Sequence, residues 1–228
     1  MTRILVIDSA TEACSVALFD DGAADTMLVA GEWAELGRGH AERLVPMIAG
    51  LPASGRADRI MVNLGPGSFT GIRVGLAAAR ALGLAWGVPV GGYGCLDLVA
   101  AMAHAAQPGQ AIDVVMSGGH GEWFFQPFAA TGAAIAALAS LSPPAVLARS
   151  AAACVAGSQA HAVAAHTGAQ ALDIRPDARA FARLDRAAWC DDISPVYGRA
   201  PDAKVAVARA PVAKTGRAKT GPGAPRAA

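Results

Sequence analysis

The chain has 228 residues, of which 54% are hydrophobic and 16% charged, and its formal net charge is +1. This composition is typical of a folded globular protein and excludes a largely disordered one. A chain of this length buries roughly 70% of the surface that its unfolded form exposes, so it needs neither disulfides nor metals to fold.

Neither the longest apolar stretch nor the amino terminus carries a targeting signal. Residues 71–92 include Arg73 and Arg80 and are broken by Pro89, so they predict a helix and a strand instead of a membrane span. The apolar run at residues 4–7 is too short for the core of a signal peptide. We therefore expect a cytoplasmic protein that does not contact a membrane.

Cysteine and lysine usage excludes several kinds of site. The four cysteines form no Cys-x-x-Cys pair, so the sequence predicts reduced, buried thiols and neither a zinc ribbon nor thioredoxin chemistry. All three lysines lie beyond residue 203, so the folded body holds no Schiff-base lysine, no lysine base and no phosphate-loop lysine. These residues are Cys14, Cys95, Cys154 and Cys190, and Lys204, Lys214 and Lys219.

The first half of the chain alternates strands and helices. Apolar runs predict an opening meander, and helices then alternate with strands in the order of a layered α/β domain. Pro46 should bend the first helix or mark its late start. The predicted strands are 4–7, 14–19, 26–33, 59–64 and 88–94, and the predicted helices are 35–51, 70–86 and 95–106.

The second half of the chain is patterned less clearly and follows a turn signal at residues 105–110. Residues 111–117 and 121–128 predict a hairpin, and residues 175–192 predict at least one further helix. The alanine-rich stretch between them has no clear period.

These patterns divide the chain into a first domain at 1–105, a smaller second domain at 106–200 and a tail at 201–228. From Lys204 onward there are six basic residues and no acidic ones, against 13 basic and 18 acidic residues before it. The tail is rich in Ala, Pro and Gly and has no aromatic residues after that point, so we expect it to be disordered. It is either a solvated end without a specific role or a weak attractor of RNA phosphates.

The stretch "NLGPGSFTGIR" at residues 63–73 raises the question of nucleotide binding, because glycine-rich loops at helix starts often hold phosphate. It does not fit Gly-x4-Gly-Lys-Ser/Thr, since Ile72 and Arg73 follow Gly71. It does not fit Gly-x-Gly-x-x-Gly either, since the third glycine comes one place late. A cation such as Arg73 opposes the dipole at a helix start unless an anion or an acidic partner lies nearby. The loop is therefore either a structural or protein-contact loop or an anion site.

Small residues recur at four-residue intervals along the helix that follows this loop. They are Gly71, Gly75, Ala79, Gly83 and Gly87. Such spacing makes a shallow groove in which another element can pack at short distance. The groove faces either the sheet of this chain or a helix of another chain.

The residues that could carry chemistry form no complete catalytic set. Asp8, at the end of the first strand, is the best carboxylate candidate, and Ser9 and Thr11 follow it in the turn. No two histidines have the spacing of a helical metal pair, since His161 and His166 are five apart. No Gly-x-Ser-x-Gly elbow occurs either. We therefore predict no catalytic residue, no cofactor and no metal.

Four stretches of the chain resemble the TsaB (YeaZ) family of accessory subunits in bacterial tRNA threonylcarbamoyladenosine formation. They are "ILVIDSATEACSVAL", "GRGHAERLVPMI", "LGPGSFTGIRVGLAAARALGLAWGVPV" and "PVYGRAPDAK", in this order over about residues 3–204, and the first half matches better. The resemblance implies an α/β fold of the actin, sugar-kinase and chaperone-ATPase type, which is ribonuclease H-like, with two related domains.

The resemblance also implies a non-catalytic scaffold or dimerisation subunit, and not an enzyme, that supports the TsaD-type transferase. A TsaE-like ATPase belongs to the same complex, a homodimer can form through the same helices, and tRNA is reached only indirectly. In catalytic relatives the first turn binds phosphate, which leaves Asp8, Ser9 and Thr11 as weak nucleotide candidates. The partner surface carried over from the family is His40, Arg43, Leu44, Met47, Arg73, Gly75, Leu76, Ala79, Arg80, Gly83 and Leu84.

Two alternatives stay open at this point. One is a nucleotide-binding ATPase of the same fold that uses Asp8, Ser9 and Thr11. The other, which fewer features favour, is a peptidase of the glycoprotease-like family. The family usually carries an Asp-Ala-Arg-like turn before the "GE" of the second-domain hairpin, where this chain has Ser117–His120 in the stretch "MSGGHGEW". The resemblance therefore assigns no role to that turn.

Overall fold

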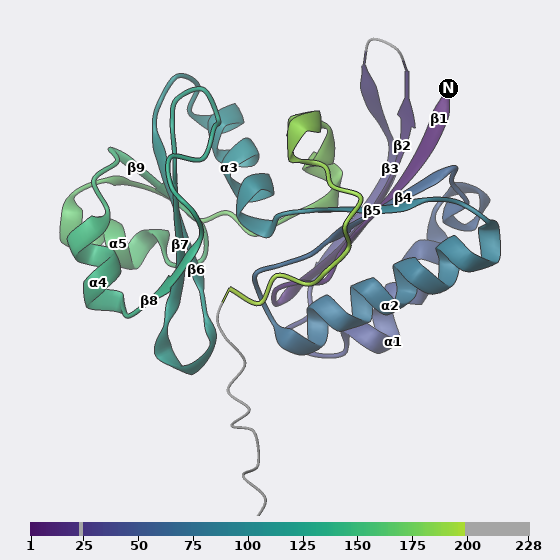
Figure 1. The fold of residues 1–228 in the computed structure, drawn as a ribbon, viewed down its shortest axis with the longest axis horizontal. Helices are drawn as coiled ribbons and strands as arrows, with labels where there is room; N and C mark the ends of the chain where they lie inside the picture. Colours follow the sequence, from purple (N-terminus) through teal and green to yellow (C-terminus); the bar gives the residue numbers. More distant parts are fainter. Residues whose placement is uncertain (23–24, 199–228) are drawn as a thin grey trace, which may run out of the picture.

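The computed structural model describes residues 1–22 and 25–198, which form two α/β units, each built on a five-stranded sheet (Figure 1). The predicted tail at 201–228 lies outside the described residues. Within the described part, no helix is long and apolar enough to cross a membrane. The four cysteines are free; Cys14, Cys95 and Cys154 are buried, whereas Cys190 is only partly buried.

The amino-terminal strands form the predicted meander followed by parallel strands. They are β1 (Thr2–Asp8), β2 (Ala13–Asp21), β3 (Thr26–Glu35), β4 (Arg59–Asn63) and β5 (Val90–Tyr93). β1 pairs antiparallel with β2 and parallel with β4, so the sheet has the order β3-β2-β1-β4-β5. The apolar runs in β1 and β4 are buried, as strands covered on both faces require.

Two helices cover one face of this first sheet (Figure 1). They are α1 (His40–Gly50) and α2 (Phe69–Trp86). Leu44 and Met47 of α1 and Leu76 of α2 are at most 3% exposed and pack on the apolar side chains of β1 and β2. This burial holds both helices against the sheet.

Helix α1 begins later than predicted. Gly37 and Gly39 have left-handed φ angles of 64° and 87°, which a helix cannot include, so the helix starts at the next residue. Pro46 lies inside α1 at an exposed position. A short 3-10 turn, η1 (Pro52–Gly55), follows the helix.

The opposite face of the first sheet is covered by elements that lie far apart in the sequence. They are α3 (Cys95–Ala106) and two 3-10 turns, η3 (Ala178–Arg183) and η4 (Arg186–Ala188). The ring of Phe181 is fully buried, with its centre 5.3 Å from that of Tyr93. The further helix predicted in this region is therefore a pair of short 3-10 turns.

The second sheet carries the predicted hairpin at its centre. Its strands are β6 (Ile112–Ser117), β7 (Trp123–Phe128), β8 (Ala139–Leu141), β9 (Cys154–Ala156) and β10 (Gln170–Leu172). β6 pairs antiparallel with β7 and parallel with β9, and the order is β10-β9-β6-β7-β8. The 3-10 turn η2 (Gly119–Gly121) joins β6 to β7, and the helices of this unit are α4 (Pro143–Arg149) and α5 (Ala160–Thr167).

Two segments pass between the units. On α3, Cys95, Val99 and Ala103 pack into the core of the second sheet, whereas Leu98 packs under the first. Residues 178–197 follow the second sheet in sequence and return to the first. Both cores thus draw on residues from either side of the predicted boundary, and the division into 1–105 and 106–200 stays a prediction.

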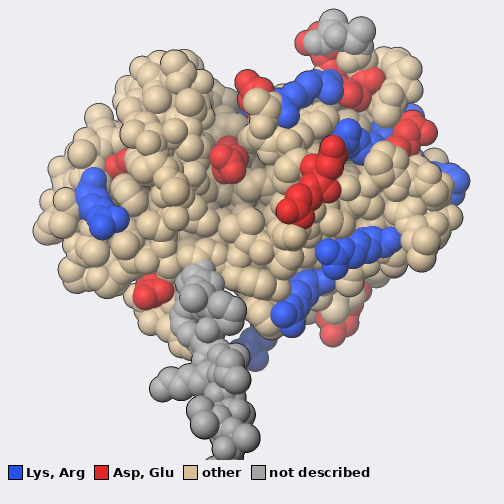
Figure 2. All heavy atoms as spheres, viewed as in Figure 1, with Lys and Arg blue, Asp and Glu red and all other residues tan. Residues whose placement is uncertain are grey.

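Charged side chains are spread unevenly over the face drawn in Figure 2. They gather over the first sheet and its helices, whereas the second unit is mostly uncharged in this view. On this face, the first unit therefore offers most of the charged groups that a binding partner could contact.

Candidate functional site

A buried polar cluster lies where the parallel strands β1, β4 and β5 end. These strands finish with Asp8, Asn63 and Tyr93, and the shared edge of the sheet brings the three side chains together. Asn63 Nδ2 donates a hydrogen bond to Asp8 Oδ2 at 2.7 Å, and the Tyr93 hydroxyl donates to the same oxygen at 3.2 Å. The backbone N–H of Ala10 donates to Asp8 Oδ1 at 3.2 Å. Asp8 is 1% exposed and accepts these three hydrogen bonds from its own chain.

Burial controls the ionisation of this cluster. Desolvation raises the pKa of Asp8 from 3.8 to about 6, and the hydrogen bonds from Asn63, Ala10 and Tyr93 offset part of that rise. Burial also raises the pKa of Tyr93 well above its ordinary value, with a further contribution from the neighbouring Asp8 charge. Near neutral pH the site therefore holds a carboxylate beside a neutral phenol.

The glycine loop packs directly on the turn between β1 and β2. The backbone N–H of Ser68 donates to the carbonyl of Ala10 at 2.6 Å, and the Ser9 hydroxyl donates to the carbonyl of Gly71 at 2.9 Å. A Cβ on Gly67 would overlap the carbonyl oxygen of Ala10, and one on Gly71 would overlap that of Ser9. These glycines are needed because two backbone segments of the same chain meet there. Of the two interpretations, the structure favours a structural loop.

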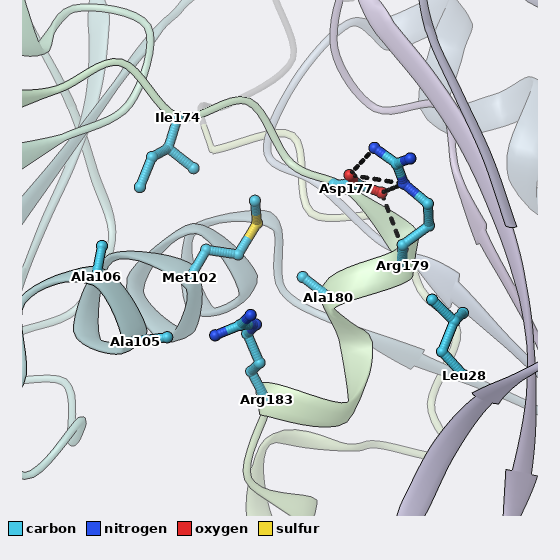
Figure 3. A pocket seen from close by; sticks show the side chains of 9 residues that line it. All are labelled: Leu28, Met102, Ala105, Ala106, Ile174, Asp177, Arg179, Ala180 and Arg183. Atoms are coloured by element: carbon cyan, nitrogen blue, oxygen red, sulfur yellow. Dashed lines mark hydrogen bonds and ion pairs between the residues drawn. The ribbon is translucent and has the colours of Figure 1, made fainter.

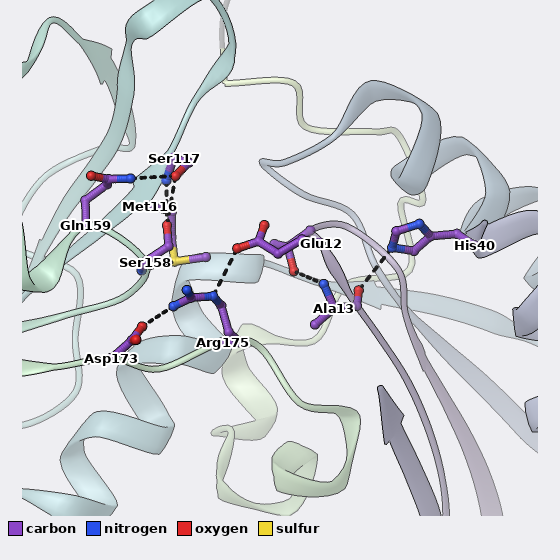
Figure 4. Close-up of polar contacts among 10 residues, drawn as sticks. Glu12, Ala13, His40, Met116, Ser117, Ser158, Gln159, Asp173 and Arg175 are labelled. Atoms are coloured by element: carbon purple, nitrogen blue, oxygen red, sulfur yellow. Dashed lines mark hydrogen bonds and ion pairs between the residues drawn. The ribbon is translucent and has the colours of Figure 1, made fainter. Parts of the chain in front are cut away.

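The remaining polar groups of the first turn are also engaged within the chain. The Thr11 hydroxyl accepts a hydrogen bond from the backbone N–H of Ala13 at 3.2 Å. Glu12 forms an ion pair with Arg175, the N···O distance being 3.0 Å, and Arg175 also pairs with Asp173 (Figure 4). The turn is thereby tied to the segment that follows β10 in the second unit.

The second turn that faces this region belongs to β6. Gln159 Nε2 donates to Ser117 Oγ at 2.7 Å, and the backbone N–H of Ser117 donates to Ser158 Oγ at 2.8 Å (Figure 4). His120 has a left-handed φ of 60°. The hydroxyl of Ser117 is thus held by its neighbours, and the role of the turn Ser117–His120 stays open. Among the described residues, no group of three or more His, Cys, Asp or Glu side chains could hold a metal ion.

Several residues of the predicted partner surface face the core of this chain. His40 is 9% exposed, with Nε2 3.3 Å from the carbonyl oxygen of Ala13, and Leu44 and Met47 are 1% exposed. A Cβ on Gly75 would lie 2.6 Å from Ser9 Oγ. The others, which are buried along the same faces of the helices, are Leu76, Ala79 and Gly83. The small-residue face of α2, from Gly71 to Gly83, therefore packs within this chain, and a partner contact through these residues stays a prediction.

Other residues of the predicted surface are exposed. Arg43 pairs with Glu32 at 3.0 Å, and the side chain of Leu84 is 86% exposed. Arg73 Nε donates to the Tyr197 hydroxyl at 3.0 Å, and Arg80 donates to a carbonyl of the same carboxy-terminal segment. Both arginines thus stay at the surface while they hold the segment that runs beside α2. They remain candidates for a contact surface.

Sequence reasoning missed the two partners of Asp8. Asn63 and Tyr93 are the last residues of β4 and β5, and three neighbouring parallel strands place their last residues at one edge of the sheet. The signal was therefore the position of each polar residue at a strand end.

The chain matches a family and several named relatives. The sequence model of TsaD, tRNA N6-adenosine threonylcarbamoyltransferase, matches residues 34–150, just over half of the chain. The tRNA threonylcarbamoyladenosine biosynthesis protein TsaB of Escherichia coli K12 is 38% identical over 103 residues, which cover 43% of this chain and 42% of that protein. The protein of the same name from Haemophilus influenzae is 38% identical over 92 residues, which cover 38% and 37%. The match thus spans less than half the length of these curated relatives.

Solved structures match over more of the chain. The structure described as YeaZ from Pseudomonas aeruginosa has a TM-score of 0.65 and 25% identity, and the match covers 79% of this chain and 88% of that one. A second structure from that organism, described as an uncharacterized protein with similarity to peptidase YEAZ, has a TM-score of 0.64 and 26% identity over the same shares. With the two mixed sheets, these matches confirm the predicted two-domain, actin-like and ribonuclease H-like fold. The chain belongs to the TsaB (YeaZ) family, within the wider group that the TsaD model describes.

Proposed function

We propose that this chain is a non-catalytic subunit in the formation of threonylcarbamoyladenosine in tRNA, and that it supports a TsaD-type transferase in the cytoplasm. The names of its relatives support the pathway. The observation that carries the non-catalytic role is the closed Asp8 site. Its carboxylate is 1% exposed and accepts three hydrogen bonds from the chain itself.

The turn between β1 and β2 supports this role, because its polar groups are already bonded within the chain. A phosphate site in that turn needs free backbone N–H groups and hydroxyls, together with a neutralising cation. Here the hydroxyls of Ser9 and Thr11 are engaged by the backbone, and the glycine loop rests on Ala10. The lysine-free body also supplies no phosphate-loop lysine. A site occupied by its own chain favours a scaffold over the alternative ATPase.

The partner surface that we propose is the outer face of α1 and α2. Val45 of α1 is 59% exposed and Leu84 of α2 is 86% exposed, and the cations of Arg43 and Arg80 lie on the same two helices. Exposed apolar side chains with charged neighbours are typical of a docking surface. The TsaD-type subunit, or a second copy of this chain, would pack its own helices there. The TsaE-like ATPase would join the same complex, and tRNA would contact this chain only indirectly.

Reconstitution with the TsaD-type protein of the same organism tests the proposal. Size-exclusion chromatography with light scattering should give a complex with the wild-type chain and none with Leu84→Asp. The control Ile135→Asp changes a side chain in the second unit that is 63% exposed, and it should leave the complex intact. If Leu84→Asp forms the complex as well as Ile135→Asp does, the partner surface is not the outer face of α1 and α2.

A second measurement addresses catalysis. The purified chain should release phosphate from ATP, and cleave peptide substrates, no faster than buffer. ATP turnover above background that disappears in Asp8→Ala would overturn the non-catalytic role and would favour the ATPase.

A further inference from the structure

A pocket of about 540 Å³ lies away from the Asp8 site, between β3 and the elements that join the two units (Figure 3). One rim is Leu28 of β3, which is 47% exposed. The opposite walls are Met102, in the second half of α3, and Ile174, which follows β10. None of these side chains takes part in the cluster around Asp8 or in the outer face of α1 and α2.

Two arginines from η3 face this pocket, and they differ in their charge balance. Arg179 is neutralised by Asp177, to which its guanidinium donates at 2.7 and 3.0 Å. Arg183 has no hydrogen bond and no ion pair with any described residue, and its guanidinium points into the pocket toward Met102 and Ala105 (Figure 3). The pocket therefore combines an apolar wall with one uncompensated positive charge.

We propose that this pocket binds a small organic anion with an apolar body. The body would cover Met102 and Ile174, and the anionic group would pair with Arg183. Ligand pockets commonly have volumes of about 300–1,000 Å³, with mostly apolar walls and a few polar groups that orient the ligand. The planar guanidinium of arginine matches the two oxygens of a carboxylate or sulfonate. The charge left unpaired on Arg183 selects an anion over a neutral or cationic ligand.

Because of the position of the pocket, such a ligand should stabilise the folded chain. Its walls come from β3 of the first sheet, from α3 and from the segment that returns from the second sheet. A ligand that binds only the folded arrangement of these three elements stabilises it by mass action. Binding should therefore raise the melting temperature of the whole chain. This inference is independent of the proposed role beside a TsaD-type transferase.

A matched pair of fluorescent probes tests the proposal on the full chain. 8-Anilinonaphthalene-1-sulfonate carries one sulfonate on an apolar body, and N-phenyl-1-naphthylamine is the same body without the charge. The sulfonate probe should bind at one site per chain, and Arg183→Gln should lower its affinity about fivefold, the upper end for an ion pair with an exposed arginine. The uncharged probe should change less than threefold. Arg183→Lys, which keeps the charge, should restore part of the affinity.

Two further variants locate the probe. Ala105→Trp adds a large side chain at an exposed position of α3 that lines the pocket, so it should weaken both probes. Arg149→Gln removes an exposed arginine of α4 outside the pocket, so it should weaken neither. Absence of sulfonate binding, or equal affinity of the wild type and Arg183→Gln, overturns the proposal. Loss of binding in Leu84→Asp without loss in Ala105→Trp also overturns it, because the probe then sits on the outer face of α1 and α2.

Discussion

Replacing Asp8 by asparagine tests whether burial of this carboxyl group destabilises the folded chain above pH 6. The side chain lies at the end of β1 and is 1% exposed. It accepts hydrogen bonds from Asn63, Tyr93 and the backbone of Ala10. The amide is close in size but has no charge to desolvate. Because its NH₂ group meets donors, we also expect a pH-independent loss of about 1–3 kcal/mol.

The pH dependence follows from the pKa of Asp8 in the two states. Burial raises this pKa from 3.8 to about 6, so between these values the folded state binds a proton that the unfolded state has lost. The stabilising effect of that proton is complete below pH 3.8 and disappears as the pH rises through 6. Because of the gap between the two pKa values, the free energy of unfolding is about 3 kcal/mol lower at neutral pH than below pH 3.8. Between about pH 4.5 and about pH 7, the wild type should lose about 2 kcal/mol that the variant does not lose.

Urea unfolding at a series of pH values measures this difference. The other groups that titrate in this pH range contribute equally to both proteins, so their effect cancels in the comparison. The free energy of unfolding of Asp8→Asn should rise relative to that of the wild type as the pH increases. Asp25→Asn changes an exposed aspartate and should keep the wild-type profile. A difference between wild type and Asp8→Asn that stays constant with pH would refute the reasoning from burial.

Three further predictions concern packing and the contact between the units. Gly75→Leu should lower the free energy of unfolding, measured by thermal melting, by about 1–3 kcal/mol, because the new side chain overlaps Ser9. A variant that melts like the wild type but fails to bind its partner would contradict this. Phe181→Ala should lower the free energy of unfolding in urea by about 3–5 kcal/mol, since the ring is fully buried, and a loss below about 1 kcal/mol would show that the segment packs loosely. Glu12→Gln breaks a partly exposed ion pair with Arg175 and should cost less than about 1 kcal/mol, so a larger loss in the same assay would mean that this pair holds the units together.

The first unit could be predicted well because its elements differ sharply in composition. The buried apolar run at residues 4–7 ends at a polar turn, and α2 begins after a loop that contains Gly65, Pro66 and Gly67. The same spacing could not tell which surface the small face of α2 contacts. Periodicity identifies the face of a helix, whereas the partner of that face depends on long-range packing.

The second unit and the pocket could not be predicted for different physical reasons. β8, β9 and β10 have three residues each, and half of α5 is alanine, so neither a strand period nor an amphipathic face stands out. The pocket joins Leu28, Met102 and Arg183, which are far apart along the chain. Only the return of the carboxy-terminal segment to the first sheet brings them together, and no local pattern encodes that return.

The return of residues 178–189 to the first sheet also sets an order of events during synthesis on the ribosome. α1 and α2 can cover their face soon after the last strand of that sheet emerges. α3 can cover part of the other face, but the rest of that face is completed only by Phe181 and Leu184, which are translated long after Tyr93. At typical rates of translation this delay is on the order of ten seconds. Throughout that time the nascent chain exposes the apolar surface around Phe19 and Tyr93, which is the kind of surface that ribosome-associated chaperones bind.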